Sequence, residues 1–503
     1  MKKLLLVCAL TALAAAAILA PGIGLKARVE SAVLTCLEGM GASHSPALLV
    51  TAGGVTFDPA RRSVRLQNVM ARAHAGQDVS VYSAAEISFT LPWRVLPAFT
   101  PLRSLLRTEN MLPVAGDITI LDLKASTGSG HAGARRIAVD VLRAQGNFLC
   151  DMLDGQPADA ATALHRMGAD TVALSSFTLA EPLAQGMHRL SLATAWMEGW
   201  QQARIARMQF DGLALHLGKD EYFRCNSLEQ KDVHLPEEAL LRRLWAAAAH
   251  AQADPASLHN LSALGDEILS SPVPLVAQAR ATGLVFVEKP HAAAIREIRF
   301  DWMPGSPART KAEILGLDVP AGLLRDALHI LGPALRADMT FENVILGPST
   351  HQKTLTFKAA GLGDAVCSLT VRASGAGAAA LWFASFSDIS LTFTDNGLLA
   401  WIGRNISPDP ALAATFLRRA AALPHLAPTQ QNAGLRAALQ TFADKPGTLE
   451  IRSLPGKTLD ASQSLTLLHD PGSLFRLAAV PGTQDLEEQI RALNLPPSGP
   501  ARP

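Results

Sequence analysis

Apolar and polar residues alternate in many short segments of this 503-residue chain, and this alternation sets strong limits on how it can fold. Examples are GVTFDPARRSVRLQNV (54–69), HRLSLATAWM (188–197) and MTFENVILG (339–347). A side-chain period of two puts apolar residues on one face of a strand and polar residues on the other. Turn residues such as Asp58-Pro59 lie between the segments and predict hairpins. We therefore expect an α+β, β-rich fold of antiparallel, one-sided sheets.

Two stretches with a helical pattern separate groups of these strands. In the first, Pro236 precedes Glu237 and Glu238, and acids in a first helical turn interact favourably with the helix dipole. Leucines recur at helical spacing after them and again around 258–268, which predicts two helices. The second stretch, from about 397 to 443, is rich in alanine and leucine. We expect these helical segments to cap the apolar faces of the sheets.

The N-terminus predicts a membrane segment or a signal peptide. After Lys2 and Lys3, no charged residue occurs before Lys26. As a helix, the run 4–25 would be about 33 Å long, enough to span a bilayer. A cleavable signal peptide fits the same residues. The length of the run favours a retained transmembrane helix in the inner membrane. Both interpretations put the rest of the chain in the periplasm, because the basic N-terminus favours the cytoplasmic side.

Changes of pattern divide the chain into five segments. Residues 1–25 form the transmembrane anchor or signal peptide, and residues 26–150 form a helix followed by antiparallel strands. Two similar parts follow, 151–335 and 336–482, each a β-sheet with a helical insertion. Within the later part, SQSLTLLHD (462–470) alternates like a strand. The last segment, 483–503, ends in LPPSGPARP and is expected to be a tail.

Composition excludes several classes of protein. With 45 basic and 44 acidic residues, the chain has no electrostatic footprint for nucleic acid. Apolar residues make up 49% and charged residues 18%, which excludes a disordered chain. Beyond the N-terminal run, the cysteines are Cys36, Cys150, Cys225 and Cys367. They are too widely spaced for a metal or redox motif, and they allow either three disulfide pairings or four separate buried thiols.

Two glycine motifs resemble nucleotide-binding loops, and we interpret both as turns. GSGHAG (128–133) follows a strand, but the next apolar residues, Ile137, Val139 and Val141, have period two. A dinucleotide site needs a helix at that point, so the motif predicts a hairpin. Gly456-Lys457-Thr458 has isoleucine at 451, where a phosphate-binding loop needs glycine. We therefore expect neither a nucleotide nor another cofactor.

Local motifs for catalysis are absent from the sequence. It has no G-x-S-x-G serine turn and no H-E-x-x-H zinc motif. The histidines are scattered, and Asp388 and Asp395, at a strand, are ordinary turn-edge residues. We assign no catalytic, cofactor-binding or metal-binding residue and expect a protein without enzymatic activity. A metal site or carboxylate pair assembled from distant residues stays open, because such sites have no local spacing rule.

The first 125 residues resemble the N-terminal part of AsmA-type envelope proteins of Gram-negative bacteria. The resemblance comprises the apolar run 4–25, an amphipathic helix over 26–40, and a hairpin over 55–69 that ends in Leu66-Gln67-Asn68-Val69. Phe341-Glu342-Asn343-Val344 echoes that phrase, and the region from 389 to about 467 is similar to the ends of uncharacterised proteobacterial membrane-anchored proteins. The family is not defined by catalytic residues. The resemblance implies an elongated periplasmic β-structure with a role in envelope or lipid homeostasis. This sequence differs from the family pattern in its helical stretches near 236–270 and 397–443.

These observations favour a membrane-anchored periplasmic protein of the cell envelope that handles lipid or serves envelope homeostasis and has no enzymatic activity. Its expected partners are the inner membrane and either lipid or another envelope protein, and we expect no nucleic acid and no nucleotide. One alternative is an envelope scaffold that binds another protein through helices and strand edges. A second alternative is an envelope hydrolase without a recognisable motif.

Overall fold

The computed structural model divides into two compact units, Met1–Leu258 and His259–Pro503. The division into five segments that we inferred from the sequence stays a prediction. The predicted anchor, 1–25, is outside the described residues. The structure describes residues 48–75, 78–95, 106–127, 130–153, 160–183, 186–253, 275–328, 334–373, 384–423, 428–460 and 463–494, together with 26, 27, 29–31, 33, 264 and 426.

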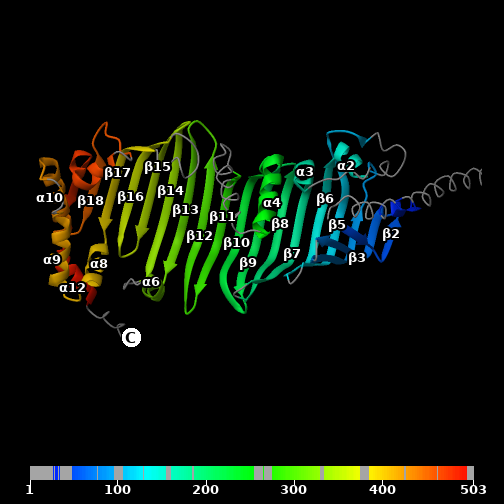
Figure 1. Cartoon of the computed structure of the whole chain (residues 1–503), viewed down its shortest axis with the longest axis horizontal. Helices are drawn as coiled ribbons and strands as arrows, with labels where there is room; N and C mark the ends of the chain where they lie inside the picture. Colours follow the sequence, from blue (N-terminus) through cyan, green and yellow to red (C-terminus); the bar gives the residue numbers. More distant parts are fainter. Residues whose placement is uncertain are drawn as a thin grey trace, which may run out of the picture. The chain divides into compact units, whose positions relative to one another are not determined.

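The first unit contains a twisted antiparallel sheet in which each strand pairs with its successor in the sequence from β2 onward (Figure 1). The strand β1 pairs with β3 beside β2. The strands are β1 (Leu48–Thr51), β2 (Gly54–Asp58), β3 (Ser63–Ala75), β4 (Asp78–Thr90), β5 (Met111–Thr127), β6 (Gly130–Gln145), β7 (Met167–Leu183), β8 (Gly186–Gln201), β9 (Arg204–Leu217) and β10 (Asp220–His234). The predicted antiparallel, β-rich architecture is confirmed.

The second unit repeats this meander. Its strands are β11 (Val276–Glu288), β12 (His291–Met303), β13 (Ala308–Val319), β14 (Leu335–Gly347), β15 (Thr350–Ala359), β16 (Gly363–Arg372), β17 (Ser385–Asp395), β18 (Thr448–Ser453) and β19 (Phe475–Val480). The helical stretch predicted over 397–443 is present as three helices inserted between β17 and β18.

Helices accompany each sheet. Those of the first unit are α2 (Gly146–Leu153), α3 (Ala160–Arg166) and α4 (Glu238–Ala253). Those of the second unit are α6 (Ala321–Leu328), α8 (Leu398–Ile406), α9 (Pro410–Ala421), α10 (Gln430–Asp444), α11 (Ser464–His469) and α12 (Leu486–Asn494). Side chains define where two of them begin: Asp409 accepts from the Ala411 amide at 3.0 Å, and Thr429 accepts from the Asn432 amide at 3.2 Å.

Several local predictions were wrong. The segment 462–470, predicted as a strand, contains the helix α11. The described part of the predicted tail forms α12, whose Leu486 and Ile490 are fully buried against Ala413 and Ala414 of α9. The strands β10, β13 and β19 and the helices α2 and α3 were not foreseen. The helix predicted around 258–268 lies mostly outside the described residues.

Both hairpins singled out in the sequence are confirmed. The strands β2 and β3 pair from Gly54↔Gln67 to Asp58↔Ser63, and the Asp58 carboxylate accepts from the Ala60 amide in the turn. On either side of the GSGHAG loop, β5 and β6 pair as far as Thr127↔Gly130. A strand thus occupies the place where a phosphate-binding helix would have to begin.

A row of residues with left-handed backbone conformation crosses the first sheet. These residues lie on one line across the sheet. On each strand, the residues just before and just after this line pair with the corresponding residues of the next strand. The left-handed residues are Asn68 (φ 49°) in β3, Asp122 (φ 51°) in β5, Ser176 (φ 52°) in β7 and Gly212 (φ 66°) in β9. Glycine, asparagine and aspartate adopt this conformation at the lowest cost. The row therefore uses residue types that suit it at three of its four positions.

This row keeps the apolar side chains of each strand on one face. In β7, apolar residues have even numbers before Ser176 (Val172, Leu174) and odd numbers after it (Phe177, Leu179). The exposed residues of β7 switch the other way, from odd numbers (171 and 173) to even numbers (176 and 178). A regular strand would turn the second set to the opposite side. The left-handed residue reverses the pleat and restores a single apolar face.

Candidate functional site

The sheet of the first unit has one continuous apolar face. Directly paired residues of antiparallel strands share a face, and Leu174 of β7 pairs with Ala195 of β8, which pairs with Phe210 of β9. Phe210 in turn pairs with Leu228 of β10. On the β5 side, Ile120 pairs with Ile137, and Ile137 with Leu174. We call this surface, in either unit, the apolar face.

The apolar face is covered at one end, whereas the larger apolar side chains of its middle strands β7 and β8 are not fully buried. Val29, in the helical segment before β1, is fully buried against Phe57 of β2 and against Val64 and Leu66 of β3. Glu30 fixes this segment by accepting from the Phe57 amide at 2.9 Å. By contrast, none of the described leucine, valine, phenylalanine or methionine side chains of β7 and β8 is buried. A second layer that covered this face would bury such residues almost completely.

The second unit has the same arrangement, covered near β18 and β19. There α10 packs on the two strands, and its Phe442 meets Phe393 of β17 edge to face with ring centroids 6.0 Å apart. In the middle of the sheet, Phe341 of β14 pairs directly with Leu355 of β15, and these side chains are 38% and 40% exposed. Cys367 of β16 lies opposite Leu355 on the same face. Exposed, paired apolar residues at a strand centre identify a surface that can receive an apolar ligand.

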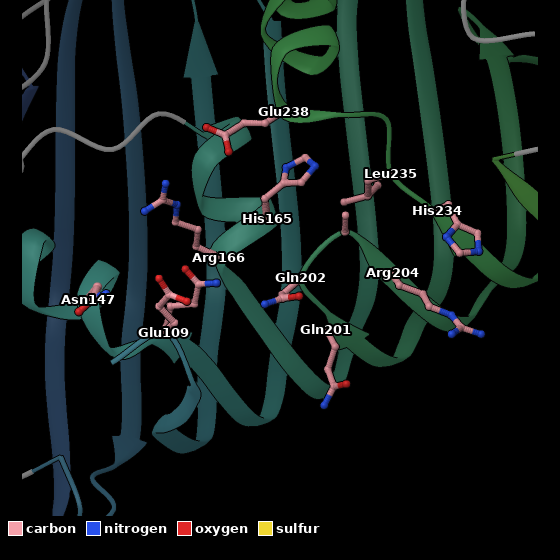
Figure 2. A pocket seen from close by; sticks show the side chains of 12 residues that line it. Glu109, Asn147, His165, Arg166, Gln201, Gln202, Arg204, His234, Leu235 and Glu238 are labelled. Carbon is pink, nitrogen blue, oxygen red and sulfur yellow. The ribbon is translucent and has the colours of Figure 1, made fainter. Parts of the chain in front are cut away.

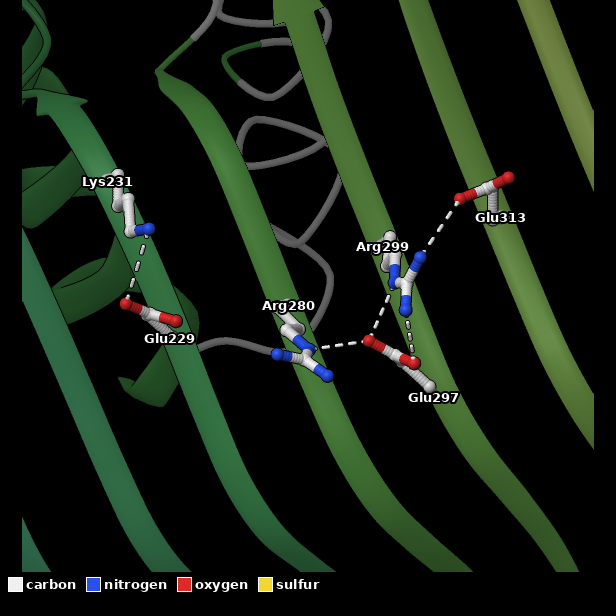
Figure 3. Close-up of polar contacts among 6 residues, drawn as sticks. All are labelled: Glu229, Lys231, Arg280, Glu297, Arg299 and Glu313. Carbon is white, nitrogen blue, oxygen red and sulfur yellow. Dashed lines mark hydrogen bonds and ion pairs between the residues drawn. The ribbon is translucent and has the colours of Figure 1, made fainter.

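The opposite face is polar and contains networks of charged side chains (Figure 3). Glu297 of β12 accepts from Arg280 Nε at 2.5 Å and from Arg299 Nε and NH2 at 2.7 and 2.8 Å. Arg299 also lies 3.9 Å from Glu313, which pairs with Lys311 at 2.8 Å. The hydrogen bonds from Arg299, and then from Arg280, hold the pKa of Glu297 below its ordinary value. These networks explain why the polar face needs no second layer.

The first unit also contains a polar cavity of about 650 Å³ at the ends of its strands (Figure 2). His165 and Arg166 reach it from α3, Gln201 from the end of β8, Gln202 from the turn after it, and Glu238 from the start of α4. Glu238 is held by Arg242 and by the Thr162 hydroxyl, which donates at 2.9 Å. The described residues that line the cavity include no serine, threonine or cysteine. The lining therefore offers no side-chain nucleophile of these types.

The other sequence motifs have structural roles in the described residues. Gly456-Lys457-Thr458 forms a turn after β18, where Gly456 has φ 72° and the Lys457 amide donates to the Leu454 carbonyl at 3.1 Å. Asp395 is buried at the start of α8 and accepts from the Leu399 amide at 3.0 Å; burial raises its pKa. Asp388 lies within β17 with φ 50°. In the described part of the chain, His, Cys, Asp and Glu side chains form no group of three that could hold a metal ion.

The structure records no disulfide among the cysteines that it describes. Cys150 and Cys225 are buried as thiols, and Cys367 is partly exposed. Cys8 and Cys36 lie outside the described residues. The interpretation of separate thiols, one of the two alternatives left open by the sequence, applies to these three cysteines.

Comparison with known proteins adds no assignment. No protein-family model, no curated protein and no solved structure matches the chain. Among the described helices, none is long and apolar enough to cross a membrane. The apolar face of each unit is therefore the feature of the described residues that bears most directly on function.

Proposed function

We propose that this protein is anchored in the inner membrane by residues 4–25 and binds lipid acyl chains on the apolar faces of its periplasmic sheets. The observation that carries the proposal is the open apolar face, above all the exposed pair Phe341 and Leu355 in the middle of the second sheet. Such a surface is costly in water unless a ligand covers it.

The chemistry of the face favours an acyl chain over other apolar ligands. The face is lined mainly by aliphatic side chains and phenylalanine, such as Ile137, Val172, Leu174 and Phe210 in the first unit. These side chains have no hydrogen-bonding groups with which to orient a polar ligand. They match methylene groups, each of which contributes about 0.8 kcal/mol when it is buried. The AsmA-type resemblance of residues 1–125 points to the same role.

A matched pair of substitutions tests this proposal. Leu355 lies on the apolar face, and Val366, on the neighbouring strand β16, lies on the opposite face, because it pairs with Thr356. The two side chains are 40% and 44% exposed, so Leu355→Asp and Val366→Asp introduce a carboxylate at equally accessible positions. Mass spectrometry then quantifies the lipids that co-purify with each full-length protein.

We expect Leu355→Asp to lose bound lipid relative to Val366→Asp, because an acyl chain on the apolar face would desolvate an unpaired carboxylate. Lipids around the anchor are common to both variants, so only the difference is informative. Equal lipid content in the wild-type protein and both variants would contradict the proposal.

A second candidate function, an envelope scaffold, is favoured by the outer side of α9. Leu412 and Phe416 are four residues apart on this helix and are 62% and 56% exposed. Such a pair fits a protein partner that offers an apolar groove. Crosslinking from position 416 in intact cells should capture such a partner, and crosslinks only within the chain would count against this function.

A further inference from the structure

Two turns beside the covered end of the first sheet form an exposed edge that is rich in arginine. The turn between β2 and β3, 59–62, contains Arg61 and Arg62, and the turn after β4, 92–95, contains Trp93 and Arg94. The two turns are joined because the Leu91 amide donates to the Arg62 carbonyl at 2.8 Å. We call Arg61, Arg62, Trp93 and Arg94 the arginine–tryptophan edge.

Trp93 is the most exposed large apolar side chain in the described residues, at 66%. The Arg62 guanidinium lies over its ring, 5.0 Å from the centroid. Tryptophan is rare on a water-exposed surface and is enriched where lipid headgroups meet water, because its ring is apolar and its N–H is polar. Its exposure here is the first sign of a lipid contact.

The charge of the edge is the second sign. Arg61 and Arg94 are exposed and make no ion pair within the described part of the chain. The neighbouring acid, Asp58, is engaged by the amides of Ala60 and Arg61 in its own turn. The edge thus carries three guanidinium groups, one of them over the Trp93 ring, and the carboxylates of Asp58 and of Asp117, which accepts from the Thr90 hydroxyl, lie near the two turns. This combination is complementary to anionic phosphate headgroups.

The position of the edge in the chain is the third sign. Lys26 directly follows the uncharged run 4–25 and lies 4.0 Å from Glu30, one helical turn further on. Glu30 accepts a hydrogen bond from the amide of Phe57, two residues before the first turn of the edge. Leu91, at the start of the second turn, belongs to the same buried cluster as Val29. The end of the proposed anchor is thus tied by short links to both turns.

We propose that the arginine–tryptophan edge binds the anionic headgroups of the bilayer that holds the anchor. This inference rests on the anchoring part of the proposed function. The contact adds a second point of attachment, and two points of attachment restrict how the first sheet can tilt against the membrane.

The test uses the full-length protein in vesicles that contain bromine-labelled phosphatidylcholine, with or without phosphatidylglycerol as the anionic lipid. Bromine at the headgroup end of the acyl chain quenches tryptophan fluorescence at that depth. Comparing the wild-type protein with Trp93→Phe isolates the signal of Trp93 from the other six tryptophans. Trp302→Phe, on β12 of the second unit, is the matched control.

We expect bromine quenching of the wild-type protein to exceed that of Trp93→Phe in anionic vesicles, and Trp302→Phe to behave like the wild type. The double variant Arg61→Gln, Arg94→Gln should lower the equilibrium constant for the quenched, membrane-contacting state by about fivefold for each arginine removed. All substituted side chains of the edge are exposed, so circular dichroism should show an unchanged fold.

Three results would overturn the inference, and they are distinguishable. If the protein floats with the vesicles but Trp93→Phe is quenched as much as the wild type, the edge makes no lipid contact while the anchor stands. If the protein fails to float with vesicles of either composition, the anchoring proposal fails as well. Equal quenching of Trp93 in neutral and anionic vesicles would remove the role of the arginines.

Discussion

The left-handed row in the first sheet leads to a quantitative prediction at Gly212. Its φ of 66° costs a residue with a side chain roughly 1–2 kcal/mol. A Cβ at this position would lie 2.8 Å from the Ala193 Cβ, well inside the ordinary contact distance, and such overpacking typically costs about 1–3 kcal/mol. Replacing glycine lowers the entropy of the unfolded chain and returns about 0.5–1 kcal/mol. Gly212→Ala should therefore destabilise the sheet by about 2–4 kcal/mol.

Hydrogen exchange of amides in β8 and β9 measures this effect locally, so it does not require the two units to unfold together. Gly434→Ala in α10 is the matched control, since open space surrounds that position, and alanine should stabilise the helix by about 1 kcal/mol. Asp122→Gly, at φ 51°, should be neutral or stabilising by up to about 1 kcal/mol. Unchanged protection in Gly212→Ala, or a clear loss in Asp122→Gly, would refute our account of the row.

Three further predictions concern the second unit. The lowered pKa of Glu297 means that its ionised form stabilises the fold above its unfolded pKa of about 4.3, and that this contribution is lost as the pH falls through the lower folded value. In urea titrations, Glu297→Gln should thus be less stable than the wild type at pH 7, and the difference should shrink as the pH falls through the lowered folded-state pKa. A difference that stays constant with pH would contradict this. Ile490→Ala should cost about 2–5 kcal/mol in thermal unfolding, because Ile490 is fully buried, whereas a disordered tail would show no effect. Asn432→Ala should cost about 1–3 kcal/mol, because the buried Asn432 Oδ1 accepts from the Gly472 amide at 2.9 Å, and destabilisation no greater than in an exposed-site control would argue against that role.

The sheet architecture was predictable where the alternation is strong. Segments such as 54–69 and 188–197 have clear apolar positions and strong turn residues, and they form the expected strands. The strand β10 was missed because DEYFRCNSLEQKDVH is mostly polar. Its position is set by pairing with β9, as in Phe223↔Leu215 and Leu228↔Phe210, and such a tertiary effect is invisible in a local pattern.

The two errors near the C-terminus have different physical causes. In SQSLTLLHD, two leucines alternate with polar residues over too few positions to separate a strand from a short helix. The helix α12 did carry a signal. Asp485 accepts a hydrogen bond from the Glu488 amide at 2.8 Å. Asp485 and Glu488 have the Asp-x-x-Glu spacing that marks a helix start, and the apolar Leu486 and Ile490 are four residues apart, as on one face of a helix.

The sequence predicted that an apolar face exists but not which residues form it. The alternation indicated that each sheet has an apolar side, but the change of phase at residues such as Ser176 hides which residues share it. Only the strand registers show that Phe341, Leu355 and Cys367 lie together. Exposure is likewise a property of what covers the sheet, and the sequence led us to expect helical caps without showing that they leave the middle strands open.

Photocrosslinking in living cells tests the central claim most directly. A photoreactive amino acid is placed at position 355 on the apolar face or at position 366 on the polar face, and the adducts are identified by mass spectrometry. Our account predicts phospholipid adducts at 355 and none at 366. Equal lipid labelling at both positions, or none at 355, would contradict the claim that this face holds acyl chains.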